Sequence, residues 1–431
     1  MAVSSSPGWE VAVKTTPPSQ LQPKQSLARW FVVAWVLAVV FYFLEYAARS
    51  APSVMVPQLA TMFHTTVLGV SSILAVYYYT YSTMSLVAGA ALDHLGAKHT
   101  IPIGVAVLAL GCLLFSAPLV IAGDIGRLLQ GAGSAFAFTG AVYLAVHGFP
   151  ARYLATAVGF TQCVGMLGGS AGQFAVGPMI ERGVSVHVVW IGLGVLCFVN
   201  AVVLFLVTPR EDQGLQAKGA SIIKPYKVVF SNPQSYVCGI IAGLLFAPTT
   251  IGDMIWGVAS LKDQHFTYHN AVITAAMVPM GWVIGCPLLG WLSDFIGRRK
   301  PVIIGGAAVM ALAVAQIAFV PALLPAKIAL LIFGIGSGAA MIPYSSIKEA
   351  NPDDVKGSAT GGINFLVFGI TAIFGPIYAN LIGRVIGTTA DHTANLHHGG
   401  WFWIICCLAA IIATLFLRET GRAVRPHVVQ P

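Results

Sequence analysis

The amino-acid sequence predicts an all-α integral membrane protein whose twelve transmembrane helices form two pseudo-symmetric six-helix bundles. The chain of 431 residues is 57% hydrophobic and only 9% charged, whereas a soluble domain contains about 25% charged residues. Twelve apolar segments each approach the roughly 20 residues that span a bilayer. A loop motif recurs after the second and the eighth segment, which indicates that the chain repeats after six helices.

The apolar segments follow one another with short polar connections between them. The predicted spans are 30–57, 68–91, 101–122, 125–149, 155–180, 188–207, 235–260, 271–292, 301–322, 328–347, 358–382 and 401–417. They divide the chain into a tail (1–28), an N-terminal bundle (29–207), a linker (208–234), a C-terminal bundle (235–417) and a second tail (418–431). The first tail is rich in Ser, Pro and Gln and is expected to be disordered. The run after Arg29 exceeds a signal-peptide core, so we expect an uncleaved first helix.

The distribution of positive charge predicts the orientation in the membrane. An even number of spans places both termini on one side. With both termini cytoplasmic, 17 of the 23 Lys and Arg residues fall in the tails, inner loops and linker, and four fall in outer loops. The net charge of +8 is therefore explained by topology. No basic cluster is interleaved with aromatic residues on a polar segment, which argues against nucleic-acid binding.

The sequence gives no sign of a cofactor, a metal site or an enzyme. All seven cysteines lie in apolar runs and none forms a C-x-x-C pair, which argues against disulfides and zinc. No H-E-x-x-H, Walker or dinucleotide motif stands in the context it requires. No nucleophile–base set is recognisable either.

The repeated loop motif carries glycines and charges at fixed spacing. Its residues are Gly290, Asp294, Gly297, Arg298 and Arg299, and those of a fainter copy are Gly89, Asp93 and Gly96. The two aspartates are 201 residues apart, and three further pairs of matching segments recur at offsets of 198 to 203 residues. We expect the first glycine to let helices approach closely and the second to permit a tight turn. We expect the aspartate to pair with the arginines or with a helix N-terminus. The alternative is an ordinary turn with stop-transfer charges.

This motif between membrane helices resembles the signature loop of the major facilitator superfamily. The resemblance implies two bundles related by an axis along the membrane normal, with substrate bound between them near the midplane. It also implies that the two motif loops act as gates on the cytoplasmic side while the bundles rock against each other.

Two charged residues stand deep in the first span. A charge near the bilayer centre costs about 2.5–3.5 kcal/mol, so Glu45 and Arg49 need an explanation. They are four residues apart with the acid first, and therefore share one helix face. One interpretation is a self-satisfied ion pair that only holds the helix. The other is an anion site next to a proton acceptor that faces a water-filled cavity.

A narrower resemblance supports the second interpretation. The stretch Tyr46-Ala-Ala-Arg49, together with Tyr81 and the segment Arg127 to Ala135, resembles helices 1, 2 and 4 of the anion:cation symporter family. The resemblance implies that Arg49 binds an organic anion and that Tyr81 lines the site. The family's two acids fall on Ala48 and Ser134 and are absent here. We therefore expect Glu45 to be the proton carrier, with Asp253 second.

Further polar residues within the spans have two interpretations each. Arg127 resembles part of a helix 4 motif linked to proton coupling, or it lies near the outer boundary and reaches the interface. Asp253 faces Arg49 across the cavity, or it is a water-exposed residue at a helix end. Gln162 and Asn364 bind substrate or form interhelical hydrogen bonds. In the second span, Tyr78 and Tyr81 share one face with Ser85, and we expect that face to line the site.

The sequence therefore favours a proton-coupled importer of a small organic anion of the carboxylate type. We expect the protein to be a monomer and to bind no cofactor. We expect it to lie in the bilayer of a bacterial inner membrane. An anion exchanger without proton coupling and an exporter of amphipathic compounds are the alternative transport functions. A membrane nutrient sensor is the alternative outside transport.

Overall fold

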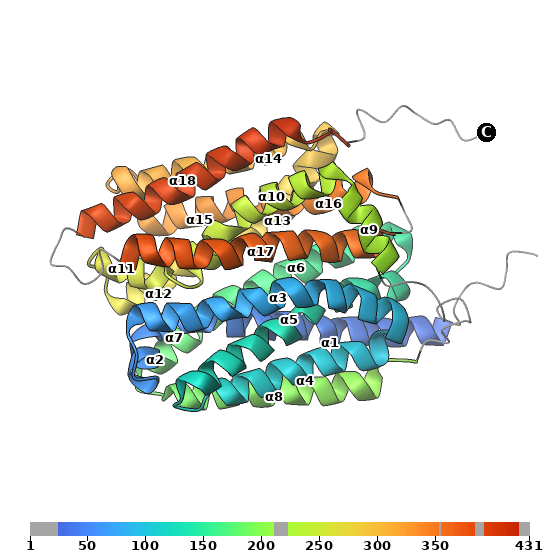
Figure 1. The fold of residues 1–431 in the computed structure, drawn as a ribbon, viewed down its shortest axis with the longest axis horizontal. Helices are drawn as coiled ribbons and strands as arrows, with labels where there is room; N and C mark the ends of the chain where they lie inside the picture. The colour runs from blue at the N-terminus through green and yellow to red at the C-terminus, as the bar shows by residue number, and fades with distance from the viewer. Residues whose placement is uncertain (1–24, 211–222, 353–354, 384–391, 422–431) are drawn as a thin grey trace, which may run out of the picture.

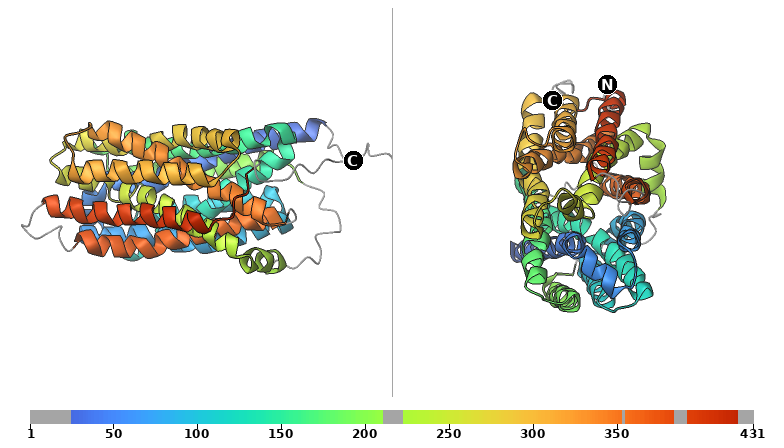
Figure 2. Two further views of the ribbon diagram at one scale, coloured as in Figure 1. Left: turned by 90° about the horizontal axis from the view of Figure 1, so that it is seen from above. Right: turned by 90° about the vertical axis from the view of Figure 1, so that its left-hand side faces the viewer.

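Long helices that run roughly parallel to one another form most of the described part of the chain (Figures 1 and 2). The computed structural model describes residues 25–210, 223–352, 355–383 and 392–421. Residues 1–24 of the predicted disordered tail (1–28), the centre of the linker and the end of the C-terminal tail lie outside the described residues. Residues 25–28 are helical, so the prediction of disorder is wrong for these four residues.

The N-terminal half contains six long helices joined by short ones. Its elements are α1 (Gln25–Ser50), η2 (Ala51–Val54), α2 (Val56–Met62), α3 (Val67–Leu95), α4 (Ala97–Phe115), α5 (Val120–Gly148), α6 (Ala151–Phe174), α7 (Val176–Glu181) and α8 (Val186–Val207). The first predicted span breaks at Ser50, where a tight 3₁₀ turn around Pro52 begins. The third ends at Phe115 rather than at residue 122, shortly before Pro118.

The C-terminal half follows a short helix in the linker and is more often interrupted. The linker helix is α9 (Ile223–Ser231). The elements of the C-terminal half are α10 (Pro233–Ala247), η3 (Pro248–Asp253), α11 (Gly257–Asp263), α12 (Tyr268–Ala275), α13 (Met277–Ile296), α14 (Lys300–Phe319), α15 (Ala326–Ser337), η4 (Gly338–Met341), α16 (Ile342–Ala350), α17 (Lys356–Gly383) and α18 (His392–Phe416). The seventh predicted span widens into a π-helical turn at Pro248, which cannot donate to the helical ladder. Such turns place side chains off the regular helical register.

The helices match the predicted spans in order. Among the described residues, ten helices are long and apolar enough to cross a membrane, and the pair α2 and α3, bent by 98°, makes an eleventh. α6, with 24 residues, occupies the remaining predicted span and packs along α1. The all-helical architecture predicted from the sequence is confirmed.

The outer surface of the bundle is apolar, as a lipid environment requires. On α8, Val195, Leu196, Phe198 and Leu206 are exposed, and only the opposite face of that helix packs against the protein. The buried Asn200 of α8 donates to the backbone oxygen of Leu37 at 3.3 Å. On α8, apolar side chains therefore point outward while the amide nitrogen of Asn200 finds a partner inside, which is the arrangement of a membrane protein.

The two halves meet along α3 with α17 and along α6 with α13. We call the end that carries Gly96, Gly297 and α9 the linker end, and the end that carries α2, α7, α11 and α12 the far end (Figure 1). At the far end, the Tyr268 hydroxyl donates to the backbone oxygen of Val54 at 2.6 Å, across the two halves. Midway, Ser82 donates to the backbone oxygen of Phe365 at 2.7 Å. In this conformation the halves are closed together at the far end.

The turn glycines of the loop motif take the conformation that their sequence predicts. Gly96 and Gly297 have φ values of 71° and 69°, which glycine adopts without the cost of a side chain. The first glycine does not behave as expected in the second copy. A Cβ at Gly290 would meet no atom within 4 Å, so no helix approaches there. A Cβ at Gly89 would lie 2.9 Å from the Tyr226 hydroxyl of α9.

The charged residues of the second motif form a small ion-pair network. The Arg299 guanidinium lies 2.7 Å from Asp294 and 2.8 Å from Glu349. Burial lowers the pKa of Arg299, but the hydrogen bonds to Glu349 and Asp294 outweigh it and raise that pKa. Arg298 is exposed. In the first copy, the side chain of Asp93 lies outside the described residues, so its predicted role remains a prediction.

The network predicts that Glu349→Gln destabilises the C-terminal half more than Asp294→Asn. Glu349 has 22% of its side chain exposed, whereas Asp294 has 58%. A hydrogen bond to a charged group contributes about 1.5–3 kcal/mol when it is shielded, and an exposed ion pair about 0–1 kcal/mol. Melting curves of the two purified variants should show the larger drop for Glu349→Gln. Equal drops would mean that the two carboxylates hold Arg299 equally.

Candidate functional site

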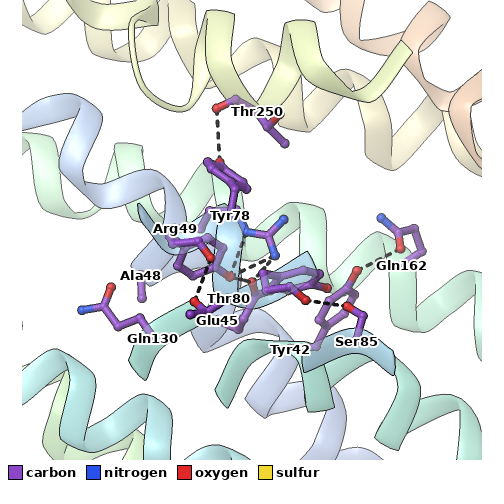
Figure 3. A network of polar contacts seen from close by, with 12 residues as sticks. Tyr42, Glu45, Ala48, Arg49, Tyr78, Thr80, Ser85, Gln130, Gln162 and Thr250 are labelled. Atoms are coloured by element: carbon purple, nitrogen blue, oxygen red, sulfur yellow. Dashed lines mark hydrogen bonds and ion pairs between the residues drawn. The ribbon is translucent and has the colours of Figure 1, made fainter. Parts of the chain in front are cut away.

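The predicted charge pair of the first span is formed and lies fully inside the protein. Glu45 and Arg49 have no exposed side-chain surface and form an ion pair through Glu45 Oε1 and Arg49 Nη2. Figure 3 shows the pair, and Tyr77 of α3 joins it through hydrogen bonds to both residues. Its hydroxyl donates to the same Glu45 oxygen and accepts from Arg49 Nε at 3.2 Å and Nη2 at 3.1 Å. One carboxylate oxygen is thus shared by an arginine and a tyrosine.

Tyr77 is a site residue that sequence reasoning missed. The predicted face of α3 contained Tyr78, Tyr81 and Ser85, and all three are buried. Tyr77 precedes Tyr81 by four residues and stacks on it, with 5.8 Å between ring centroids. This i, i+4 spacing was visible in the sequence and would have added Tyr77 to the face.

Arg127 of α5 extends the network inside the protein. It is 1% exposed, so the alternative in which it reaches the outer interface is wrong. Its Nη1 donates to Gln130 Oε1 at 2.6 Å and to the backbone oxygen of Ala48 at 3.4 Å. Its guanidinium carbon lies 4.8 Å from the centre of the Tyr77 ring. We call Glu45, Arg49, Tyr77, Arg127 and Gln130 the buried charge cluster.

The buried charge cluster holds more positive than negative charge. It contains two arginines and one carboxylate. Neither arginine forms an ion pair with any other acid in the described part of the chain. Three of its polar atoms are buried without a hydrogen-bond partner: Glu45 Oε2, Arg49 Nη1 and Arg127 Nε. An uncompensated buried charge is costly, so the cluster is suited to receive an anion.

Next to the cluster, the two halves enclose a small central space of about 10 Å³. Its walls come equally from both halves. The lining residues are Tyr42, Tyr46, Tyr81, Phe138 and Gln162 from the N-terminal half and Phe246, Met341, Tyr344, Asn364 and Phe368 from the C-terminal half. That volume holds about one water molecule. A larger molecule therefore enters only after the walls move apart.

The two predicted amides, Gln162 and Asn364, face this space in equivalent arrangements. Tyr42 donates to Gln162 Oε1 at 3.1 Å in one half (Figure 3). Tyr344 donates to Asn364 Oδ1 at 2.7 Å in the other. Both amide nitrogens are buried and lack a partner. Each half thus presents an amide donor, held by a tyrosine, to the same space.

Arg49 lies behind the aromatic wall of the central space. Its guanidinium carbon is 4.4 Å from the ring centre of Tyr46, 4.8 Å from that of Tyr81 and 5.2 Å from that of Phe368. These rings therefore separate the cation from the central space. The aromatic faces also stabilise the buried charge. The structure therefore brings Arg49, Tyr81, Gln162 and Asn364 together.

Two other predicted site residues lie elsewhere. Tyr78 does not line the central space; its hydroxyl donates to the backbone oxygen of Thr250 at 3.3 Å and so links the two halves. Asp253 forms no ion pair with Arg49 and lines a separate cavity towards the far end. The expectation that it faces Arg49 is wrong for this conformation. The π-helical turn η3 changes the register on which that expectation depended.

Comparisons with known proteins agree with this architecture. Residues 38–376 match the family model "Major Facilitator Superfamily". A "Hexuronate transporter" of Escherichia coli (strain K12) is 28% identical over 197 residues, which are 43% of this chain and 43% of the relative. The chain thus matches less than half the length of that curated relative.

Solved transporters share the fold. A mutant form of the nucleoside transporter NupG superposes with a TM-score of 0.69 at 14% identity, covering 89% of this chain and 99% of NupG. The xylose transporter XylE from E. coli, in a partially occluded inward-open conformation, gives 0.67 at 15% identity, covering 91% and 99%. With the family model matching most of its length, the chain belongs to the Major Facilitator Superfamily of membrane transporters.

Proposed function

We propose that this transporter takes up a small organic anion of the carboxylate type together with protons, by alternating access. The observation that carries the proposal is the excess of positive charge in the buried charge cluster, directly behind the central space. A neutral substrate would leave that charge uncompensated. An anion at Arg49 would compensate it in a site from which water is largely excluded, where the attraction is strong.

Arg49 has the free bonding capacity that an anion requires. Its Nη1 has no hydrogen-bond partner, and its other nitrogens bond to Tyr77 and Glu45. Guanidinium groups bind carboxylates with two parallel hydrogen bonds. An incoming carboxylate would use Nη1 and replace Glu45 on Nη2. The ion pair seen here would then be the state without substrate.

The central space favours a substrate with hydroxyl groups beside its carboxylate. The unpartnered nitrogens of Gln162 and Asn364 are donors, and the surrounding tyrosine hydroxyls both donate and accept. The relative named as a hexuronate transporter fits this idea, because a hexuronate carries one carboxylate and several hydroxyls. We therefore propose a hydroxylated carboxylate as the substrate class.

Glu45 is the proposed proton carrier. Its Oε1 is shared by Arg49 and Tyr77, and its Oε2 is buried without a partner. Once a substrate occupied Arg49, the carboxylate would be left unpaired in a dry site and would take up a proton. Arg127 stays near Tyr77, so the cluster with anion and proton bound would carry the same net charge of about one positive unit as the cluster without them. Asp253 is too separate from this cluster to share the role in this conformation.

The topology proposed for transport places the linker end in the cytoplasm, with both termini inside. The far end is closed by Tyr268, and the motif loops at the linker end would lock and release the halves. The two halves of one chain enclose the central space, so a monomer suffices. We propose the inner membrane of a bacterium as the location.

Arg49→Lys should weaken substrate binding by about 10- to 100-fold, the loss of one or two hydrogen bonds to a charged group. Lysine keeps the charge but loses the planar fork. The measurement is binding of sugar acids to purified protein in a counterflow or calorimetric assay. Arg182→Lys is the matched control, because Arg182 is exposed at the far end. Normal binding by Arg49→Lys would refute the anion site.

Glu45→Gln should abolish uptake driven by a pH gradient and retain exchange of substrate at equal pH. Glutamine keeps the size and hydrogen bonding of the side chain but cannot carry a proton. The test uses proteoliposomes with a pH gradient as the only driving force, and Glu181→Gln, an exposed acid, as control. Accumulation against the substrate gradient by Glu45→Gln would show that Glu45 is not the proton carrier.

A further inference from the structure

A second cavity lies inside the C-terminal half, towards the far end and apart from the central space. Its volume is about 140 Å³, close to the roughly 150 Å³ that accommodates a benzene molecule in a protein core. It is bounded by η3, α11, α13, α14, α15, α17 and α18. None of its described lining residues belongs to the buried charge cluster or to the walls of the central space.

Asp253 supplies the cavity with an unpaired carboxylate. The residue is 5% exposed, and neither carboxylate oxygen has a hydrogen-bond partner. Gln173 of α6 lies near the carboxyl, but its amide nitrogen donates to Ser53 Oγ at 3.3 Å. Asp263 of α11 also lines the cavity, and no described lining residue is basic. A buried carboxylate without a charged partner is costly, and a cation bound beside it would compensate its charge.

The walls around this carboxylate are aromatic and uncrowded. Trp403, Tyr378 and Phe333 line the cavity, and aromatic faces attract cations. Two glycines keep the polar atoms uncovered. A Cβ at Gly257 would lie 2.8 Å from Asp253 Oδ1, and one at Gly252 would lie 2.9 Å from Trp403 Nε1. Alanine at either position would fill space beside the carboxylate or the indole.

We propose that this cavity binds a small organic cation, an alkylated ammonium of about the size of benzene, with its charge against Asp253 and its methyl groups against the aromatic walls. The sign of the ligand is opposite to that proposed for the central space. The inference does not depend on the transported substrate, because the cavity and its residues are separate from the buried charge cluster.

The test is calorimetric binding of choline to the purified full-length protein in nanodiscs, compared with 3,3-dimethyl-1-butanol, its neutral isostere. Wild-type protein should bind choline at least about tenfold more tightly than the neutral alcohol, the equivalent of one charge-assisted contact. Asp253→Asn should remove this difference. Glu181→Gln, which removes an exposed acid at the same end, and Arg49→Lys should both leave choline binding unchanged.

A steric variant tests the same site without changing its charge. Gly257→Ala should weaken choline binding by at least about tenfold, because the added methyl group occupies the space beside Oδ1. Elution volume and melting temperature check that each variant is folded. If Asp253→Asn does not fold, the test is the difference in affinity between choline and its neutral isostere, measured on wild type and on Gly257→Ala. Absence of choline binding, or equal binding by wild type and Asp253→Asn, would overturn the proposal.

Discussion

The rest of the structure depends on the burial of charge in a site from which water is largely excluded. Glu45 and Arg49 cannot be solvated where they lie, so their energy is set by what surrounds them. Tyr77 bonds to both, and the rings of Tyr46 and Tyr81 cover the guanidinium. With Arg127 nearby, the cluster keeps an excess of positive charge. That excess is the basis of our proposal that the central region of the molecule receives an anion.

This constraint connects the charge cluster to the movement of the halves. The central space takes its walls from both halves, and Phe368 of the C-terminal half covers a cation that belongs to the N-terminal half. Separating the halves would therefore remove the Phe368 cover from Arg49 at the moment when a path for substrate opens. An anion bound at Arg49 would then stabilise the positive charge that the Phe368 ring had partly stabilised before. The contact between Phe368 and Arg49 thus takes part both in closing the halves and in stabilising the buried charge.

Much of the fold could be predicted from the sequence, because a bilayer requires long apolar helices and the loop motif marks the repeat. Span order, the glycine turn at Gly297 and the Glu45–Arg49 pair depend on local spacing, which the sequence contains. Contacts between helices do not. Tyr77 joins the pair from another helix, and the π-helical turn at Pro248 carries Asp253 away from Arg49. Gln162 and Asn364 could be predicted as polar residues within the spans. Their equivalent tyrosine partners could not, because Tyr42 and Tyr344 lie on other helices.

The central claim is that an anion displaces Glu45 from Arg49 and that Glu45 then accepts a proton. The most direct measurement is the uptake of protons by purified transporter in weakly buffered solution when a binding sugar acid is added, followed with a pH indicator. Wild type should take up protons as it binds, and Glu45→Gln should bind the same anion without taking them up. Equal proton uptake by both proteins, or none by wild type, would contradict the account.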